Sequence, residues 1–370
     1  MTDDSFRFEA RAWLTANAGP YLDSGLPFAG AGDAAAVDRG RAWQRTLHAG
    51  GWAGLGWPER YGGRDLPLAA QAVWAEELAA AGAPTPFNLL GEAVVGPALL
   101  AHGTEEQRRR YLPPILDGSE IWCQLFSEPG AGSDLAAVGT TAVAGDADRW
   151  VVHGHKSWSS GAHYAERGLL LACTDAGAPR HRGLTCFLVD MGQPGVEARP
   201  VRQMTGEAAF DDVFLDGAQV DDADRLGPVG AGWAVAMTAL ASERLRLGLG
   251  LARTGAGVER LLDGLRRRPE AKDPVVRQLA AQLVVDARVA QWLASRVAEG
   301  PGAALAKLAS ARVSRSYDEL VDAMRGAGSM LTDEHTLRQL WLPATRIAGG
   351  TDEVLKDVVA ERILGLPRGS

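Results

Sequence analysis

The spacing of apolar residues changes twice along this chain, and that change constrains the fold more than any other feature. In residues 1–117 apolar side chains recur every three or four positions, which is typical of amphipathic helices. Representative positions are Leu68, Ala72, Ala75, Leu78 and Ala79. In residues 118–225 short apolar runs bounded by turn residues replace this pattern and predict strands. In residues 226–370 the helical spacing returns.

The middle segment has several strand-like runs with no helical stretch between them, which predicts a small antiparallel barrel or sandwich. These runs are Trp150–Val152, Gly168–Cys173, Leu184–Val189 and Val213–Leu215. Four helical stretches follow, at Trp233–Leu251, Val276–Leu293, Ala303–Met324 and Glu353–Leu364. We therefore predict an α+β chain with an N-terminal helical domain (1–117), a central β-barrel domain (118–225) and a C-terminal four-helix bundle (226–370).

Local signals sharpen two boundaries in this layout. Thr104 and Gln107 have the spacing of a capping box, which predicts a helix that begins after Thr104. Pro113-Pro114 is expected to interrupt that helix or to lie in its bend. The glycines of 227–232 superficially suggest a dinucleotide-binding loop. No strand–helix–strand unit surrounds them, so we expect a turn that leads into the next helix.

Composition narrows the classes of function. A net charge of −8 argues against a nucleic-acid partner. There is no run of about 18 apolar residues that could span a membrane, and the start does not resemble a signal peptide. The three cysteines, Cys123, Cys173 and Cys186, stand apart in apolar runs, which favours reduced thiols and a cytoplasmic protein. No spacing of cysteine and histidine predicts a metal site.

Two strings in the middle segment have a pattern that suggests ligand binding. Residues 127–134 read Ser-Glu-Pro-Gly-Ala-Gly-Ser-Asp, and their small residues would let the backbone approach a flat, polar ligand closely. Residues 154–162 read Gly-His-Lys-Ser-Trp-Ser-Ser-Gly-Ala. Each has a plainer interpretation: the first as a surface turn, the second as a strand that ends in a turn with Trp158 in the core.

Taken together, the two strings resemble the flavin-binding signature of the acyl-CoA dehydrogenase family, and the order of segments resembles that family over essentially the whole chain. The resemblance implies FAD as cofactor, with Trp158 against the ring and Ser160 hydrogen-bonded to its edge. Ser133 is implied to lie between the flavin and the thioester end of the substrate. The implied cofactor-binding residues are Gln124, Leu125, Phe126, Ser127, Gly132, Ser133, Trp158, Ser159, Ser160, Thr351 and Glu353.

The family removes two hydrogens from adjacent carbons of an acyl thioester. A carboxylate takes the α-proton and flavin takes the β-hydride, so the position of that carboxylate decides the mechanism. Many members carry Tyr-Glu-Gly-Thr before the last helix, with the glutamate as base. The matching position here is Gly349, which has no side chain. Its N–H could still polarise the substrate carbonyl.

A second segment can supply the base. In isovaleryl- and long-chain-type members the base lies on the helix after the β domain, immediately before an arginine, and Glu243 and Arg244 match that pair. The resemblance implies Glu243 as the catalytic base, with Arg244 and Gly349 near the substrate. The plainer interpretation is an exposed ion pair on a helix.

Other departures concern the adenine side of the cofactor. No Arg-x-x-Phe-Gly occurs between Arg253 and Asp273, and a Gly-Gly-x-Gly loop is reduced to residues 325–329. These changes resemble the actinobacterial branch, some of whose members act on steroid side chains as heterotetramers. The implied partners are an acyl-CoA, an electron-transferring flavoprotein, and either identical subunits (dimer or tetramer) or a related subunit. Two alternatives stay open: a non-catalytic or half-site subunit, and an enzyme for carrier-protein-bound acyl groups.

Overall fold

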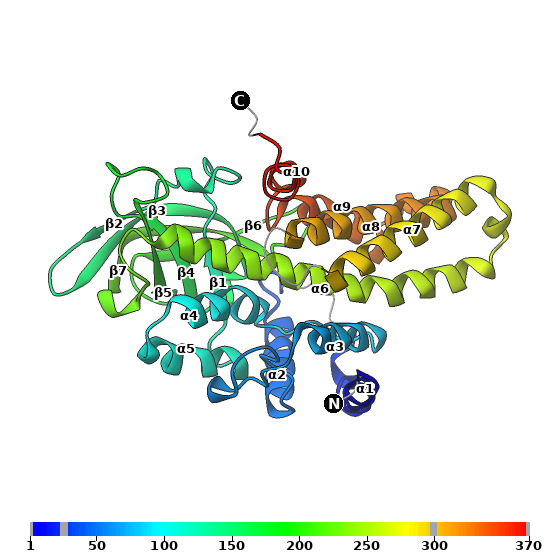
Figure 1. The fold of residues 1–370 in the computed structure, drawn as a ribbon, viewed down its shortest axis with the longest axis horizontal. Helices are drawn as coiled ribbons and strands as arrows, with labels where there is room; N and C mark the ends of the chain where they lie inside the picture. Colours follow the sequence, from blue (N-terminus) through cyan, green and yellow to red (C-terminus); the bar gives the residue numbers. More distant parts are fainter. Residues whose placement is uncertain (1–2, 23–28, 297–301, 368–370) are drawn as a thin grey trace. The chain divides into compact units, whose positions relative to one another are not determined.

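The computed structural model describes residues 3–22, 29–296 and 302–367, and Figure 1 shows their ribbon. They divide into two compact units. The first unit comprises the described parts of 1–23, 67–84 and 244–370, and the second those of 24–66 and 85–243. The division falls within helix α6 (Gly232–Arg266), between Glu243 and Arg244.

The second unit is built on one eight-stranded sheet. Its strands are β1 (Trp122–Leu125), β2 (Thr141–Ala144), β3 (Arg149–Ser160), β4 (Arg167–Cys173), β5 (Leu184–Asp190), β6 (Val196–Val201), β7 (Phe210–Asp221) and β8 (Arg225–Leu226). The hydrogen-bonded order is β6-β7-β3-β2-β4-β5-β8, and β1 pairs with β4.

The expectation of a purely antiparallel sheet is wrong at two places. β1 runs parallel to β4, and β2 meets β4 through one parallel pair, Thr141 with Cys173. The reason is topological. Strands β2 and β3 form an antiparallel hairpin that lies between β1 and β4 in the chain. After this hairpin the chain enters β4 in the same direction as β1, so the two strands pair in parallel.

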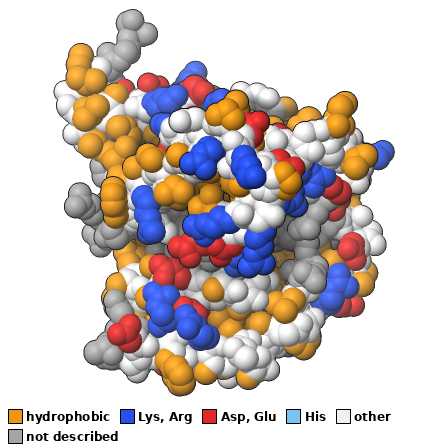
Figure 2. All heavy atoms as spheres, turned by 90° about the vertical axis from the view of Figure 1, so that its right-hand side faces the viewer, with side chains coloured by type: hydrophobic (Ala, Val, Ile, Leu, Met, Phe, Trp, Pro, Cys, Tyr) orange, Lys and Arg blue, Asp and Glu red, His pale blue; other side chains and the backbone are white. Residues whose placement is uncertain are grey.

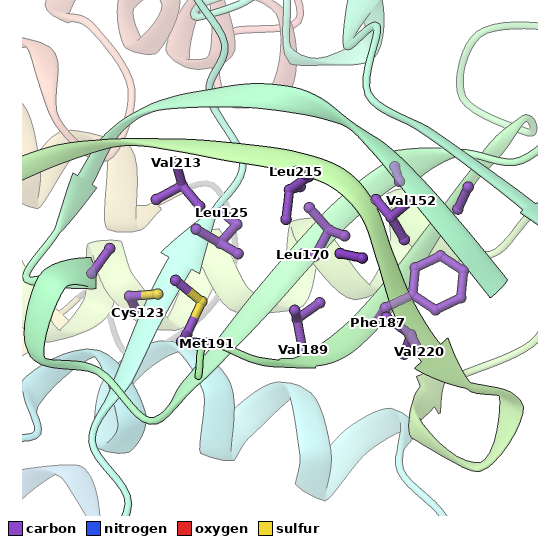
Figure 3. Close-up of a cluster of buried hydrophobic side chains, with 14 residues drawn as sticks. Cys123, Leu125, Val152, Leu170, Phe187, Val189, Met191, Val213, Leu215 and Val220 are labelled. Atoms are coloured by element: carbon purple, nitrogen blue, oxygen red, sulfur yellow. The ribbon is translucent and has the colours of Figure 1, made fainter. Parts of the chain in front are cut away.

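The sheet surrounds its own hydrophobic core. Fourteen buried residues from strands β1 to β5, from β7 and from the adjoining turns form one cluster, and Figure 3 shows Leu125, Leu170, Phe187 and Leu215 among those that point into it. Inward residues alternate with outward ones along β7, as the pleat of a strand requires. This packed core fixes the ends of β1 and β3, where the two strings of the candidate site lie.

Helices complete the second unit. They are α2 (Ala34–Ala49), α4 (Gly96–His102), α5 (Glu105–Asp117) and the first part of α6. The capping box that the sequence predicts is present, because Thr104 Oγ1 accepts the Gln107 N–H at 3.2 Å and the Gln107 side chain accepts the Thr104 N–H. Helix α5 continues through Pro113 and Pro114, so these prolines do not end it. Gly227 and Gly230 have positive φ in the turn that leads into α6, as predicted.

The first unit contains α1 (Asp3–Asn17), α3 (Leu68–Ala80) and the C-terminal helices. Trp13 packs against Trp74 with ring centroids 6.0 Å apart, and Glu77 accepts ion pairs from Arg7 and Arg11, both at 2.8 Å. These contacts join α1 to α3 although α2 lies between the two helices in the sequence.

The C-terminal helices are the rest of α6, α7 (Pro274–Arg296), α8 (Gly302–Arg325), α9 (Glu334–Ile347) and α10 (Asp352–Arg362). A buried cluster that includes Val258, Leu283, Val313 and Leu320 joins α6, α7 and α8. Helix α9 is absent from the sequence-based expectation, which counted α10 as the fourth helix. Short 3-10 or π turns lie at Gly19–Tyr21, Glu59–Tyr61, Gly91–Val95, Leu135–Ala137, Ala162–Tyr164, Asp222–Asp224, Pro269–Lys272 and Gly326–Met330.

On the face shown in Figure 2, Lys and Arg side chains lie close to Asp and Glu side chains, with apolar side chains between them. Among the described helices none combines the length and the apolar character needed to cross a bilayer. Within the described residues no group of three or more His, Cys, Asp or Glu side chains could hold a metal ion.

Candidate functional site

The loop that follows β1 is closed by its own backbone. Glu128 and Ala131 exchange two N–H···O bonds of 3.0 and 3.1 Å. Gly130 and Gly132 have ordinary φ, and a Cβ built on either would meet nothing within 4 Å. Packing within this chain therefore does not require glycine there, whereas a ligand lying against the backbone would. The loop fits the close approach of a flat group such as a flavin.

The residues of 124–134 face different surroundings. The Leu125 side chain is fully buried in the β core, so only its backbone could reach a ligand. Phe126 is buried, whereas Gln124 and Ser127 are partly exposed. Gly132 and Ser133 are exposed, and the next residue, Asp134, forms an ion pair of 2.8 Å with Arg180.

Trp158 is the most unusual residue of the second string. It has φ +59°, a left-handed conformation that bulky residues rarely adopt, and its side chain is 61% exposed. The strand register explains this, because Lys156 pairs with Val213 and Ser159 with Asp211, so two residues of β3 oppose one of β7. A large aromatic held in a strained bulge and turned toward solvent is a feature of ligand sites.

The two serines after Trp158 lie on opposite faces of the strand. The Ser159 side chain is buried beside the core and its Oγ is shielded from solvent, whereas Ser160 is partly exposed. The Ser160 hydroxyl could therefore reach a ligand from solvent, whereas the Ser159 hydroxyl could not. The Ser157 N–H donates to the Ser127 carbonyl at 2.9 Å. The structure thus brings the two strings side by side.

In the first unit the loop between α9 and α10 is a pair of glycines in left-handed conformations. Gly349 has φ +68° and Gly350 has φ +102°. Arg244 Nε donates to the Gly349 carbonyl at 2.9 Å. Two residues that the sequence places near the substrate are therefore in direct contact. The bond orients the Gly349 peptide from its carbonyl side.

The residues after the glycines begin α10. Thr351 is the N-cap, and its Oγ1 accepts the Val354 N–H at 3.2 Å. Glu353, in the first turn, is exposed. Asp352 is buried and accepts hydrogen bonds from Lys307 (3.2 Å) and Arg346 (2.9 Å). Burial acts to raise the pKa of Asp352, but these two cations outweigh it and hold the pKa below its usual value.

Glu243 is the last residue of the second unit and lies inside α6. Its side chain is partly buried, with Oε2 shielded from solvent. Glu243 and Arg244 are neighbours on one helix and therefore project in different directions.

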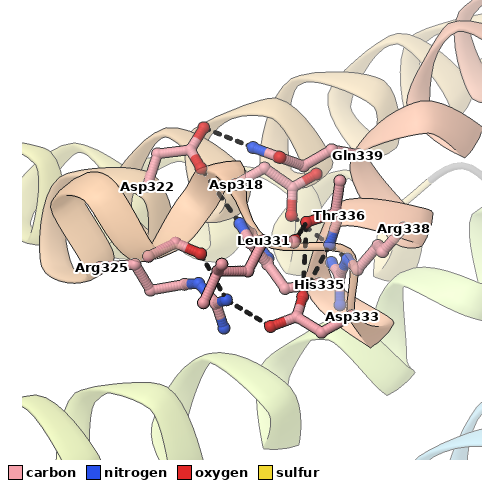
Figure 4. A network of polar contacts seen from close by, with 10 residues as sticks. Asp318, Asp322, Arg325, Leu331, Asp333, His335, Thr336, Arg338 and Gln339 are labelled. Atoms are coloured by element: carbon pink, nitrogen blue, oxygen red, sulfur yellow. Dashed lines mark hydrogen bonds and ion pairs between the residues drawn. The ribbon is translucent and has the colours of Figure 1, made fainter.

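The turn between α8 and α9, where the sequence has its reduced glycine loop, is occupied by internal polar contacts. Figure 4 shows Arg325 bonded to Asp333, and His335 pointing toward Asp322, at 3.1 Å. Arg325 also donates to the Gly328 carbonyl at 2.9 Å. Arg325 thus holds the turn, a role that no local sequence pattern indicates.

Comparison with known families covers most of the chain. Three family profiles match: "Acyl-CoA dehydrogenase, N-terminal domain" at residues 7–119, "Acyl-CoA dehydrogenase, middle domain" at 123–217, and "Acyl-CoA dehydrogenase, C-terminal domain" at 230–364. Both strings described above lie within the middle-domain match, and Gly349 to Glu353 lie within the C-terminal match.

Individual relatives agree. The acyl-CoA dehydrogenase IpdE1 of Mycobacterium tuberculosis is 40% identical over 99% of this chain and 98% of its own length. Among solved structures, the Tcur3481-Tcur3483 steroid ACAD is 28% identical with a TM-score of 0.86, covering 99% of this chain and 98% of that one. The ChsE4-ChsE5 complex of Mycobacterium tuberculosis is 27% identical with a TM-score of 0.85, again covering 99% and 98%.

Proposed function

Because this chain belongs to the acyl-CoA dehydrogenase family, we propose that it oxidises an acyl-CoA between the α and β carbons, with Glu243 taking the α-proton and FAD accepting the β-hydride. The enzyme is a FAD-dependent oxidoreductase.

One observation carries the proposal for the cofactor site. Trp158 is exposed and strained in its bulge, beside a loop whose glycines face open space. Strain of this kind persists only where the surroundings enforce it, and it concentrates at functional sites. We place the flavin ring against Trp158 and the backbone of 124–127, with the Ser160 hydroxyl at its edge. Leu125 and Ser159 contribute backbone only.

The thioester end is assigned to the Gly349 loop. The α-proton becomes acidic only when negative charge developing on the thioester oxygen is stabilised by fixed donors. Gly349 has a peptide N–H, and its carbonyl is held by Arg244. We propose that Arg244 positions this loop so that the Gly349 N–H can donate to the thioester oxygen. Ser133, Thr351 and Glu353 are assigned to the substrate and flavin by the same family pattern.

Glu243 is proposed as the base because the usual position carries no carboxylate. Gly349 cannot take a proton, and Glu243 directly precedes the arginine that holds the Gly349 carbonyl. The Glu243 side chain is partly buried, so it is not the fully exposed ion pair of the plainer interpretation.

The relatives suggest both a substrate class and an assembly. A relative described as a steroid ACAD supports a bulky, ring-bearing acyl-CoA as substrate. That relative and the ChsE4-ChsE5 complex each carry two protein names, which supports assembly with a related subunit as an alternative to identical subunits. We further propose that an electron-transferring flavoprotein reoxidises the enzyme.

The test is anaerobic flavin bleaching. The purified protein is mixed with CoA thioesters of steroid side-chain acids and, separately, of straight-chain fatty acids, and flavin absorbance is followed. We expect bleaching with the bulky thioesters. Glu243→Gln should retain FAD and slow bleaching by at least about 100-fold, the usual contribution of a general base.

Glu259→Gln is the matched control, because Glu259 is an exposed glutamate on the same helix. It should bleach at the parent rate. Bleaching of Glu243→Gln at the parent rate would refute the base assignment. If the protein takes up FAD only when a related subunit is added, the half-site alternative replaces the assignment of a self-sufficient enzyme.

A further inference from the structure

A fully buried lysine contacts the chain segment that begins the proposed flavin loop, and the chemistry proposed above does not use it. The Lys156 side chain has 0% exposure, and its Nζ donates to the Phe126 carbonyl at 3.0 Å. The same Nζ lies 2.8 Å from Glu128 Oε1. A buried ammonium is costly unless it is paired and hydrogen-bonded, and here it is both.

The carboxylate of the pair serves a third segment of chain. Glu128 Oε2 accepts the Gly139 N–H at 2.6 Å, and Oε1 accepts the Thr140 N–H at 2.9 Å. Burial acts to raise the pKa of Glu128, but the charge of Lys156 and these hydrogen bonds hold it below its usual value. The pair therefore connects the start of the loop, the residues that lead into β2, and β3.

The two tied segments are those proposed to contact the flavin ring. Phe126 and Glu128 flank Ser127, and Lys156 directly precedes the bulge that contains Trp158. A backbone hydrogen bond also joins the segments, from the Ser157 N–H to the Ser127 carbonyl. The ion pair and this bond therefore act on the same two segments.

We propose that Lys156 and Glu128 are positioning residues, which hold the 127–134 loop and the 157–158 bulge at the spacing that the flavin ring requires before the ring binds. The inference rests on the proposed placement of the ring between these segments. It concerns preorganisation rather than stability. A buried ion pair is often no more stabilising than apolar residues of the same size, whereas its directional bonds do define a geometry. If the space between the loop and the bulge, here called the slot, is already formed in the apo-protein, less conformational entropy is lost when the flavin binds.

The test compares charge-free replacements of two ion pairs. Lys156→Met together with Glu128→Gln removes both charges at nearly constant volume, so neither partner is left alone. The control, Arg225→Met with Asp222→Asn, removes a partly buried pair of the same unit that is separate from the loop. Each apo-protein is titrated with FAD, and amide hydrogen exchange is measured for residues 126–134. The visible circular dichroism of the flavin is recorded at saturating FAD.

We expect the Lys156/Glu128 variant to exchange its loop amides faster in the apo form while the β4 and β5 amides keep their protection. If the slot is then formed for about a tenth of the time, the Kd for FAD rises about tenfold. The flavin dichroism should change as well, because the ring surroundings differ. The control should match the parent in all three measurements.

Unchanged loop exchange together with unchanged flavin dichroism would overturn the inference, even if stability fell. Loss of protection throughout the strands of the second unit would also overturn it, because the pair would then be structural. Failure of the proposed function is distinguishable from both outcomes: a parent protein that binds no FAD removes the flavin assignment, and the exchange measurement still decides whether the pair orders the loop.

Discussion

Trp158 offers a direct test of stored backbone strain. The side chain is 61% exposed, so it removes roughly 80 Å² from water, taking about 200 Å² for a fully buried tryptophan. Its truncation to alanine or to glycine should therefore cost about 2 kcal/mol in either case. The two variants differ in the backbone, because glycine adopts φ +59° freely and alanine does not.

The stability difference between Trp158→Gly and Trp158→Ala is the balance of two backbone contributions. Relief of a left-handed conformation gains about 1–2 kcal/mol, and glycine in a strand interior costs about 0.5–1 kcal/mol relative to alanine. From the midpoints of these ranges, Trp158→Gly should be more stable than Trp158→Ala by about 0.75 kcal/mol, the reverse of the usual order in a strand. Both variants should lose FAD affinity, because both lack the ring.

The assay is native-state hydrogen exchange of the β3 amides in the apo-proteins, which reports the free energy of opening for this strand alone. The matched control is the same pair of substitutions at His153, an exposed β3 position with ordinary φ. There glycine should be less stable than alanine. A Trp158→Ala variant at least as stable as Trp158→Gly would refute the strain argument.

Three further outcomes follow from contacts in the described residues. Arg244→Lys should lose the hydrogen bond to the Gly349 carbonyl and lower the anaerobic bleaching rate, with FAD still bound. Asp352→Ala should lower the unfolding free energy by about 3–5 kcal/mol in urea titrations, because a buried cation loses its partner. The pKa of Asp222 is held at about 2 by hydrogen bonding to Arg225, so its contribution to stability is complete above the ordinary pKa and falls as pH drops from about 4 to 2. Solvent screening limits this loss to about 1 kcal/mol, and Asp222→Asn should abolish it.

A different result would contradict each of these three predictions. Arg244→Lys with parent kinetics would remove Arg244 from the thioester end. Asp357→Ala, at an exposed position of α10, is the control for Asp352 and should leave stability unchanged. An equal effect of both substitutions would mean that helix propensity rather than the buried cation is responsible. A pH profile of Asp222→Asn that still falls between pH 4 and 2 by the parent amount would assign the loss to other carboxylates.

Most of the fold follows from periodicity, and the exceptions have physical causes. Helix α9 has apolar residues at helical spacing, Leu337, Trp341 and Ala344, but Pro343 inside it obscures the pattern. Helix α9 nevertheless continues through the proline to Ile347. The parallel pairing of β1 with β4 depends on the order in which strands meet, and local sequence does not indicate that order.

The candidate site was predictable in its residue types and less so in its orientations. The loop glycines and Trp158 stand out in the sequence, but the inward orientation of Ser159 follows from the bulge, which no sequence pattern indicates. Lys156 had a signal that could have been used: it lies four residues after the buried Val152, on the inward face of the strand. Its partner Glu128 is far away in the sequence, and only the folded chain brings the two together.

The three thiols differ in accessibility, and this difference can be used to measure how often the sheet of the second unit opens. Cys123 and Cys186 are completely buried, and burial raises the pKa of both, whereas Cys173 is partly exposed. A thiol reagent should therefore modify Cys173 in the native protein and reach the other two only when the sheet opens. Because Cys123 lies in β1, directly before the loop that we propose to bind the flavin, its labelling rate would report how often that strand opens, and bound FAD should slow that rate.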